Sequence, residues 1–404
     1  MNLGRAAALV AAMLLSFAGT LAFRVSVPAV SFYTRSVLEA SALGVGLLTS
    51  AFFVARASTA VAVGSAVDRW PKALAFASAP CFALNALAVQ LYAYASTLPQ
   101  VLGIRFLQGV LNGVAWVTVQ YLLGRVAEES YRGRAYAIYF ASGSLGGVAG
   151  NAIYSALARE PMGVVLAVSS SFFLAASGLA ALLAYLSRGF LGPAVLSTRR
   201  GRRPGEQRGG SAVAAALLLT VVMGVSVFGS ILRGDLVYVY LNEVLGLGRG
   251  GAAAFVASAS LVALVGGYLL SWLSDRVGEY RALTAATSIA FVGAVCSAIT
   301  SPLAALLGIA LFYTSQSAVT SVSRRAAVTR YRLGGTVLGL LNASSNVGSV
   351  AGAALAGWLY DTLGSSTLIL INSTGASAMM LLMCFAPLAS LVAATTLTRT
   401  EVQK

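Results

Sequence analysis

Long apolar stretches alternate with short breaks that carry most of the charged residues along the whole chain. Each stretch is long enough for a helix to cross the roughly 30 Å of hydrocarbon in a bilayer. The expected spans are 6–28, 41–66, 73–95, 100–124, 135–157, 163–187, 212–236, 251–272, 282–300, 303–323, 336–358 and 366–392. The pattern predicts an all-α membrane protein with twelve transmembrane helices.

The composition also favours lipid over water as the surrounding solvent. Hydrophobic residues make up 58% of the 404 residues, charged residues only 10%, and the mean hydropathy is +0.84. So few polar residues do not cover the surface of a soluble globule. A cleaved signal peptide is the alternative for the first span, because Arg5 precedes an apolar run that ends in small residues.

Basic residues outnumber acidic residues by 27 to 12, which gives a net charge of +15. They gather in alternate breaks between the spans, and the densest group lies in residues 188–208. Because basic loops stay in the cytoplasm, we expect both termini on the cytoplasmic side of the cell membrane. The charge then follows membrane topology, and no nucleic-acid partner is expected.

Two sequence segments recur in the two halves of the chain. Asp68-Arg69 follows the second span, and Asp275-Arg276 follows the eighth, 207 residues later. The fifth span contains SLGGVAGN, and the eleventh contains NVGSVAGA 202 residues further on. Duplicated halves of this kind are typical of transporters. We expect two pseudo-symmetric six-helix bundles, at 1–190 and 212–404, joined by a cytoplasmic linker at 191–211.

These segments resemble motifs of the major facilitator superfamily. GSAVDRWPK resembles the signature between spans 2 and 3, and RFLQG is similar to the fourth-span motif. GGVAGN resembles the fifth-span motif of drug:proton antiporters, but Gly147 replaces its proline and Asn151 its last glycine. The resemblance implies alternating access by rocking of the two bundles. It also implies a cytoplasmic gate motif in two copies, at Gly64, Asp68, Arg69, Asp275, Arg276 and Gly278.

Small residues at four-residue spacing mark both repeated spans. Such residues let helix backbones approach closely, which stabilises helix pairs in lipid. Two interpretations stay open, namely static packing and surfaces that slide when the bundles rock. The candidate packing residues are Gly143, Gly146, Gly147, Gly150, Gly348 and Gly352.

Four arginines fall inside expected spans, where a charge costs roughly 3 kcal/mol or more. Arg105 begins a polar face in the fourth span, and the resemblance implies that spans 1, 4, 7 and 10 line a central cavity. For the arginines of spans 1 and 7, the alternative is snorkelling to the outer interface. The candidate cavity residues are Arg24, Arg56, Arg105, Gln108, Asn112, Trp116, Arg233, Tyr313 and Gln316.

Acidic residues are scarce near the spans, where Asp235 and Asp361, both toward outer ends, are the acids apart from Asp68 and Asp275 of the gate motif. The cavity is therefore expected to be electropositive and to favour an organic anion. Asp235 is the candidate proton site, with a structural ion pair to Arg233 as the alternative. The expected function is secondary active or facilitative transport of a small organic solute. A proton-coupled multidrug efflux antiporter and a non-transporting sensor are the alternatives.

Several kinds of catalytic site are missing from the sequence. The chain has no histidine, its three cysteines show no CxxC spacing, and neither Lys72 nor Lys404 lies in a GxxxxGK[ST] loop. We expect no enzyme activity, no cofactor and no metal. The expected partners are a small-molecule substrate, protons as a candidate coupling ion, and the lipid bilayer, around a monomeric protein.

Overall fold

The computed structural model of the protein describes residues 3–128, 131–191, 212–299, 301–330, 334–363 and 375–402. Within these ranges every regular element is a helix. Nine of the described helices are long and apolar enough to cross a membrane. The predicted all-α membrane fold is confirmed. Contacts divide the chain into two compact units, each built from both halves of the sequence.

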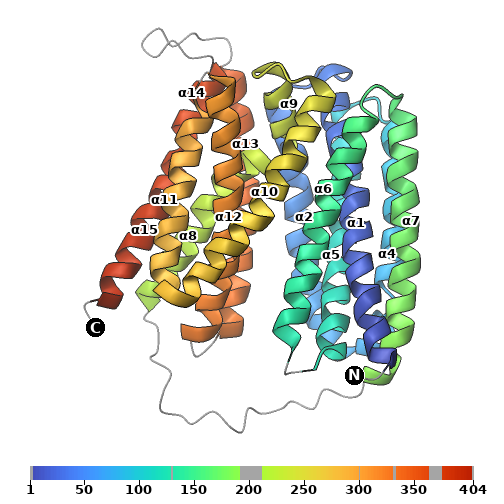
Figure 1. The fold of residues 1–404 in the computed structure, drawn as a ribbon. Coiled ribbons are helices and arrows are strands. Elements are labelled where there is room, and N and C mark those ends of the chain that lie inside the picture. Colours follow the sequence, from blue (N-terminus) through green and yellow to red (C-terminus); the bar gives the residue numbers. More distant parts are fainter. Residues whose placement is uncertain are drawn as a thin grey trace. The chain divides into compact units, whose positions relative to one another are not determined.

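The first unit comprises Met1–Glu39, Ala51–Gly201 and Leu247–Ala257. Within it, α1 packs against α6 and α7, and α4 packs against α5 and α7 (Figure 1). Its elements are α1 (Leu3–Ser36), most of α2 (Ala42–Arg69), α3 (Pro71–Leu74), α4 (Ser78–Leu91), η1 (Tyr92–Tyr94), α5 (Leu98–Val126), α6 (Arg132–Ala156), α7 (Met162–Ser187) and η2 (Arg188–Phe190).

The second unit comprises Ala40–Ser50, Arg202–Gly246 and Ser258–Lys404. Within it, α8 packs against α12, α13 and α15, and α11 packs against α12 and α15. Its elements are α8 (Ala212–Arg233), α9 (Leu236–Glu243), most of α10 (Gly248–Val277), α11 (Glu279–Ser297), α12 (Pro302–Arg330), α13 (Gly334–Leu363), α14 (Gly375–Met383) and α15 (Phe385–Val402).

Two expected spans are each divided into shorter helices. The span expected at 73–95 becomes α3, α4 and η1. Of the span expected at 366–392, residues 366–374 lie outside the described part of the chain, and the rest forms α14 and the start of α15. Pro80 and Pro387 lie in the first turns of α4 and α15. A proline is tolerated there because the first-turn N–H has no helical partner, but inside a helix it removes a hydrogen bond. The two prolines therefore mark where the new helices begin.

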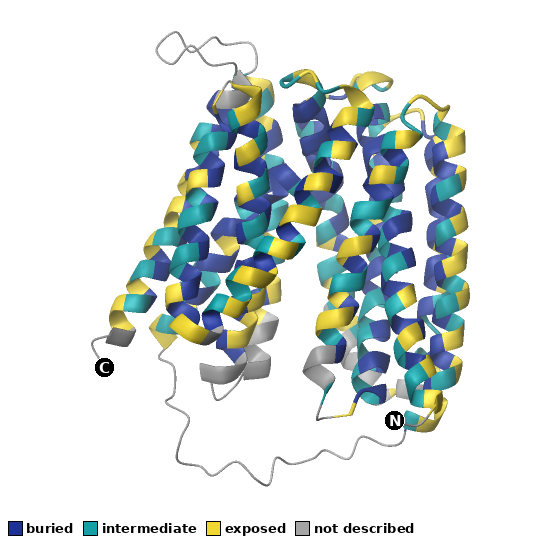
Figure 2. Ribbon diagram, viewed as in Figure 1, coloured by how far each residue is buried: buried dark blue, intermediate teal, exposed yellow. Residues whose placement is uncertain are grey.

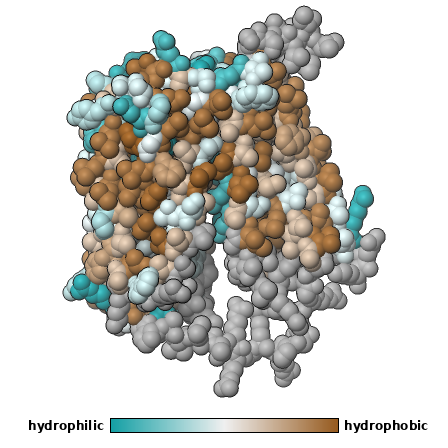
Figure 3. Space-filling model, turned by 180° about the vertical axis from the view of Figure 1, so that it is seen from behind, coloured by the Kyte–Doolittle hydropathy of each residue, from teal (hydrophilic) through white to brown (hydrophobic). Residues whose placement is uncertain are grey.

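The outer helices expose apolar side chains along their length. Leu174 and Leu182 of α7 are exposed, as are Leu388 and Val392 of α15, and exposed stripes run along α7 (Figure 2). Figure 3 shows hydrophobic side chains over much of the middle of one face and hydrophilic ones mainly along its upper edge. A surface of this kind suits contact with lipid.

Candidate substrate and coupling residues

Two glycines of α5 bring α2 close to it in the first unit. A Cβ added at Gly109 would lie 2.8 Å from the Ala55 Cβ, and one added at Gly113 would lie 2.8 Å from the Thr59 Cβ. Only glycine permits this approach of the two backbones. The contact places Arg56 beside the middle of α5, since a Cβ at Gly113 would also lie 3.0 Å from the Arg56 carbonyl oxygen. This glycine pair was missed, although its four-residue spacing is visible in the sequence.

Arg105 of α5 is held by an aromatic ring and an amide. Arg105 is only 1% exposed. Its guanidinium carbon is 5.3 Å from the centre of the Phe23 ring of α1. The Arg105 Nη1 donates a hydrogen bond to Gln108 Oε1 (3.3 Å), and the Tyr92 hydroxyl donates to the same oxygen (2.7 Å). The ring and the amide offset part of the cost of burying the charge.

The polar face predicted on α5 continues one turn further along the helix. Asn112 Nδ2 donates to Asn85 Oδ1 of α4 (3.3 Å), and Trp116 Nε1 donates to Asn112 Oδ1 (2.8 Å). Gln108 and Asn112 therefore point toward η1 and α4 of their own unit. Asn85 and Tyr92 were missed, and the one signal for Asn85 was a lone amide within an apolar span.

Two further arginines of the first unit are partly buried. The stem of Arg24 in α1 lies against α6, since a Cβ added at Gly150 would be 2.8 Å from the Arg24 Cβ. Arg56 of α2 interacts electrostatically with the buried phenol of Tyr139 in α6. Among the described residues, no carboxylate is paired with Arg56. The first unit thus contains arginines from α1, α2 and α5.

The second unit repeats the pairing of a cation with a ring. The guanidinium carbon of Arg233 in α8 lies 4.9 Å from the centre of the Tyr313 ring of α12, and its Nη2 donates to the Tyr313 carbonyl oxygen (3.3 Å). The Tyr313 hydroxyl donates to the Leu232 carbonyl oxygen. One turn along α12, the Gln316 side chain lies against Gly229 of α8. Tyr313 and Gln316 follow Arg105 and Gln108 by 208 residues.

Both acids near the spans bind the first turns of α2, which belong to the second unit. The Thr49 hydroxyl donates to Asp235 Oδ2 (2.8 Å), and the Asp235 backbone N–H donates to Thr49 Oγ1 (2.9 Å). Asp361 of α13 accepts the backbone N–H groups of Ala42 and Leu43, each at 2.8 Å. Asp361 therefore caps α2, where the free N–H groups and the helix dipole favour an anion.

The first turns of α10 make the reciprocal connection in the first unit. The Ser155 hydroxyl donates to the Gly250 carbonyl oxygen (2.8 Å), and Arg249 Nη2 donates to Ser36 Oγ (3.1 Å). The Arg249 guanidinium also lies 5.7 Å from the centre of the Phe32 ring. One helix from each half of the sequence thus begins in the unit formed mainly by the other half.

The glycines of the repeated segments pack against the first helix of their own unit. In α6, a Cβ at Gly150 would lie 2.6 Å from the Leu21 carbonyl oxygen, and one at Gly146 would overlap the Phe17 carbonyl oxygen. Gly143 meets Ser16 of α1, whereas Gly147 is looser. In α13, a Cβ at Gly348 would lie 2.7 Å from the Met223 carbonyl oxygen of α8, and one at Gly352 would overlap that of Val227. This geometry favours static packing within each unit.

The sequence matches the family described as Major Facilitator Superfamily over residues 12–353. The chain belongs to this superfamily. It is a multi-pass integral membrane protein that acts as a secondary transporter of a small solute, and it is not an enzyme. A comparison with curated proteins finds no match.

Solved structures of facilitators share this fold at low sequence identity. A bacterial homolog of the human lysosomal transporter Spinster is 16% identical with a TM-score of 0.76, and the match covers 99% of this chain and 98% of that chain. The nucleoside transporter NupG is 12% identical with a TM-score of 0.66, covering 98% and 99%. A POT family transporter in complex with a thioalcohol-conjugated peptide is 13% identical with a TM-score of 0.73, covering 98% and 96%.

The described part of the structure includes Arg276 and Gly278 of the predicted gate motif. Gly64, Asp68, Arg69 and Asp275 lie in helical turns whose side chains are outside the described part of the structure. Gly278 lies directly before α11 with φ +88°, a conformation that favours glycine. The Arg276 guanidinium lies 4.1 Å from the centre of the Trp272 ring in the same helix. The gate role stays a prediction.

Proposed function

We propose that this facilitator transports a small organic anion across the cell membrane. The observation that carries the proposal is Arg56, which is partly buried and paired with no carboxylate among the described residues. A charge within the bilayer is costly unless a partner offsets it. A substrate carboxylate or phosphate is a suitable partner, and Arg24 and Arg105 add positive charge in the same unit. The sequences of α1, α5, α6 and α7 contain no acidic residue.

The donors of the first unit also suit an anion. Within the described residues, the buried Gln108 Nε2 has no hydrogen-bond partner. The amide nitrogen only donates hydrogen bonds, and the oxygens of an anion only accept them. A cationic amine also only donates, so it would leave Gln108 Nε2 unsatisfied. The candidate cavity residues are therefore more complementary to a carboxylate or phosphate than to a cationic drug.

The proposed transport cycle is alternating access, in which residues 1–190 rock against residues 212–404. The bonds from Thr49 to Asp235 and from the start of α2 to Asp361 join a helix of the first half to residues of the second half. Rocking would break both bonds. Hydrogen bonds to a charged carboxylate are roughly twice as strong as bonds to a neutral group. Protonation of Asp235 would weaken its bond to Thr49, which makes Asp235 the candidate coupling site.

The proposed orientation places both termini in the cytoplasm. It rests on the basic residues in alternate breaks between the spans, including the Arg-rich segment 188–208 between the halves. Asp235, directly before α9, and Asp361, near the end of α13, then lie toward the outer side of the membrane. The proton site would be closer to the outside than the Asp-Arg gate motifs are.

A thermal-shift screen of purified protein tests the preference for anions. Carboxylates, phosphates, sugars and cationic drugs are compared on the wild type, on Arg56→Gln and on Arg159→Gln, a control that removes an exposed loop arginine. A ligand at 100 times its Kd stabilises a protein by about 2.7 kcal/mol. We expect an anion to stabilise the wild type and Arg159→Gln but not Arg56→Gln. Stabilisation by cations alone, or an unchanged response of Arg56→Gln, would contradict the proposal.

A further inference from the structure

A cavity of about 230 Å³ lies between α10 and α12 in the second unit. Tyr268 and Trp272 of α10 form an aromatic wall, and three serine side chains add hydroxyl groups. Arg325 of α12 supplies a positive charge to the lining. A concave site with aromatic walls and a few polar groups is typical of ligand binding.

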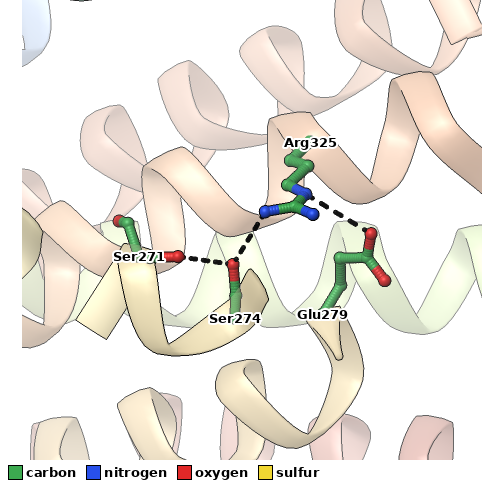
Figure 4. A network of polar contacts seen from close by, with 4 residues as sticks. All are labelled: Ser271, Ser274, Glu279 and Arg325. Atoms are coloured by element: carbon green, nitrogen blue, oxygen red, sulfur yellow. Dashed lines mark hydrogen bonds and ion pairs between the residues drawn. The ribbon is translucent and has the colours of Figure 1, made fainter. Parts of the chain in front are cut away.

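Contacts with α10 and α11 fix the guanidinium of Arg325 at this cavity (Figure 4). Its Nη1 donates to Ser274 Oγ at 3.4 Å, and its Nε lies 3.5 Å from Glu279 Oε1. The Ser274 hydroxyl in turn donates to the Ser271 carbonyl oxygen at 2.6 Å. The Arg325 side chain is 42% exposed, whereas that of Glu279 is only 10% exposed. The cation is thus oriented by its neighbours and remains accessible.

The ends of α10 and α12 and the start of α11 carry a surplus of positive charge. Arg276 lies at the end of α10 over the Trp272 ring, and Arg324 precedes Arg325 in α12. The acids of this region are Asp275 and Glu279. Its arginines are Arg276, Arg281, Arg324, Arg325 and Arg330. This surplus attracts anions.

An exposed apolar stripe on α10 leads to the cavity. Its side chains are between 45% and 71% exposed and recur every three or four residues, so they share one face of the helix. They are Leu261, Val262, Val265, Tyr268, Leu269 and Trp272. From Leu261 to Trp272 the helix rises about 16 Å, which matches roughly half of the hydrocarbon thickness of a bilayer. Tyr and Trp, at the cavity end, are the residues enriched where hydrocarbon meets headgroups.

We propose that this cavity binds the anionic headgroup of a phospholipid whose acyl chains lie along the α10 stripe. Arg325 and the serine hydroxyls would contact the phosphate, and the aromatic wall would lie at the level of the glycerol backbone. The length of the stripe favours a lipid over a free anion, because a free anion uses only the polar end of the site. A lipid bound there would bridge α10 and α12, so it would stabilise the second unit.

Native mass spectrometry of the delipidated full-length protein tests this site. The protein is mixed with equal amounts of dioleoyl phosphatidylglycerol and dioleoyl phosphatidylcholine, which differ in headgroup charge. We expect a preference for phosphatidylglycerol that Arg325→Gln lowers about fivefold. Arg281→Gln removes an equal charge from an exposed residue outside the cavity lining, and it should keep the preference. No preference in the wild type, or an equal loss in both variants, would overturn the proposal.

Inorganic phosphate and a second variant complete the test. Millimolar phosphate should not displace phosphatidylglycerol if the acyl chains contribute to binding. Full displacement would indicate a site for free anions and would overturn the lipid proposal. Should Arg325→Gln fail to fold, Trp272→Leu removes one of the two rings of the aromatic wall while it leaves the Arg325–Glu279 contact in place. Wild-type lipid binding by Trp272→Leu would also contradict the proposed site.

Discussion

In the first unit Arg105 of α5 lies over the Phe23 ring of α1, whereas in the second unit Arg233 of α8 lies over the Tyr313 ring of α12. Tyr313 follows Arg105 by 208 residues, and Arg233 follows Phe23 by 210 residues. The first unit thus has the arginine on α5 and the ring on α1, whereas the second unit has the arginine on α8, the counterpart of α1, and the ring on α12, the counterpart of α5. The contact between the two helices is kept, while the helix that carries the charge differs.

The remaining charges differ more strongly between the two halves. The first unit adds Arg24 and Arg56, whereas the second unit contains Asp235 and Asp361, both bound to the start of α2. A duplicated fold thus carries most of its intramembrane cations in one half and its intramembrane acids in the other. This difference supports a division of labour, in which the first half binds an anion and the second half couples transport to protons.

The tight glycine contacts that both halves share, of α6 with α1 and of α13 with α8, predict the largest effect on stability. Gly146→Val and Gly352→Val each place a branched side chain against a carbonyl oxygen of the neighbouring helix, so each should destabilise the protein by ~2–3 kcal/mol. Thermal unfolding in detergent measures the change. The looser Gly147→Ala serves as the control and should lie within ~0.5 kcal/mol of the wild type. A large effect in one half only would break the equivalence of the two contacts.

The acid of the second half predicts the next largest effect. A pH difference of one unit supports at most about a tenfold accumulation of solute per coupled proton. Asp235→Asn should abolish this accumulation in liposomes. It should retain the exchange of solute that is measured when no pH gradient is present. Asp361→Asn keeps an oxygen that caps α2, so it should retain the accumulation. Accumulation by Asp235→Asn at the wild-type level would remove this residue as the coupling site.

Replacing the rings of the two cation–ring pairs should have the smallest effect, a change in anion affinity. The comparison shows which half binds the anion. Phe23→Leu removes the ring beneath Arg105, so it should weaken anion binding by about two- to fivefold in a titration. Phe23→Tyr keeps the ring and should bind the anion as the wild type does. Tyr313→Leu removes the ring of the second unit and should leave anion affinity unchanged. The reverse pattern would assign anion binding to the second half.

The sequence predicted the fold because lipid imposes a strong constraint on it. A span must be apolar over its whole length, and that signal is visible in one sequence. The division of the spans at Pro80 and Pro387 was not predicted, since both prolines lie within apolar runs. The placement of the first turns of α2 and α10 was not predicted either. It depends on contacts such as Asp361 with the start of α2, which join residues 318 and 319 positions apart.

The polar residues of the site were found more easily than their partners. A charged residue such as Arg105 stands out in an apolar span, and periodicity groups it with Gln108 and Asn112. The direction of that face depends on the rotation of α5 in its bundle, which periodicity does not define. For this reason Asn85, Tyr92, Tyr139 and Thr49 were missed, although each contacts or lies near a predicted residue.

Solute exchange in proteoliposomes tests the central claim most directly. Vesicles loaded with unlabelled carboxylates, phosphates, sugars or amines receive the matching labelled solutes outside, with wild type, Arg56→Gln or Arg159→Gln in the membrane. We predict that an anion exchanges through the wild type and Arg159→Gln, and about tenfold or more slowly through Arg56→Gln. Exchange of amines alone, or anion exchange through Arg56→Gln at the wild-type rate, would contradict anion transport by the arginines of the first unit.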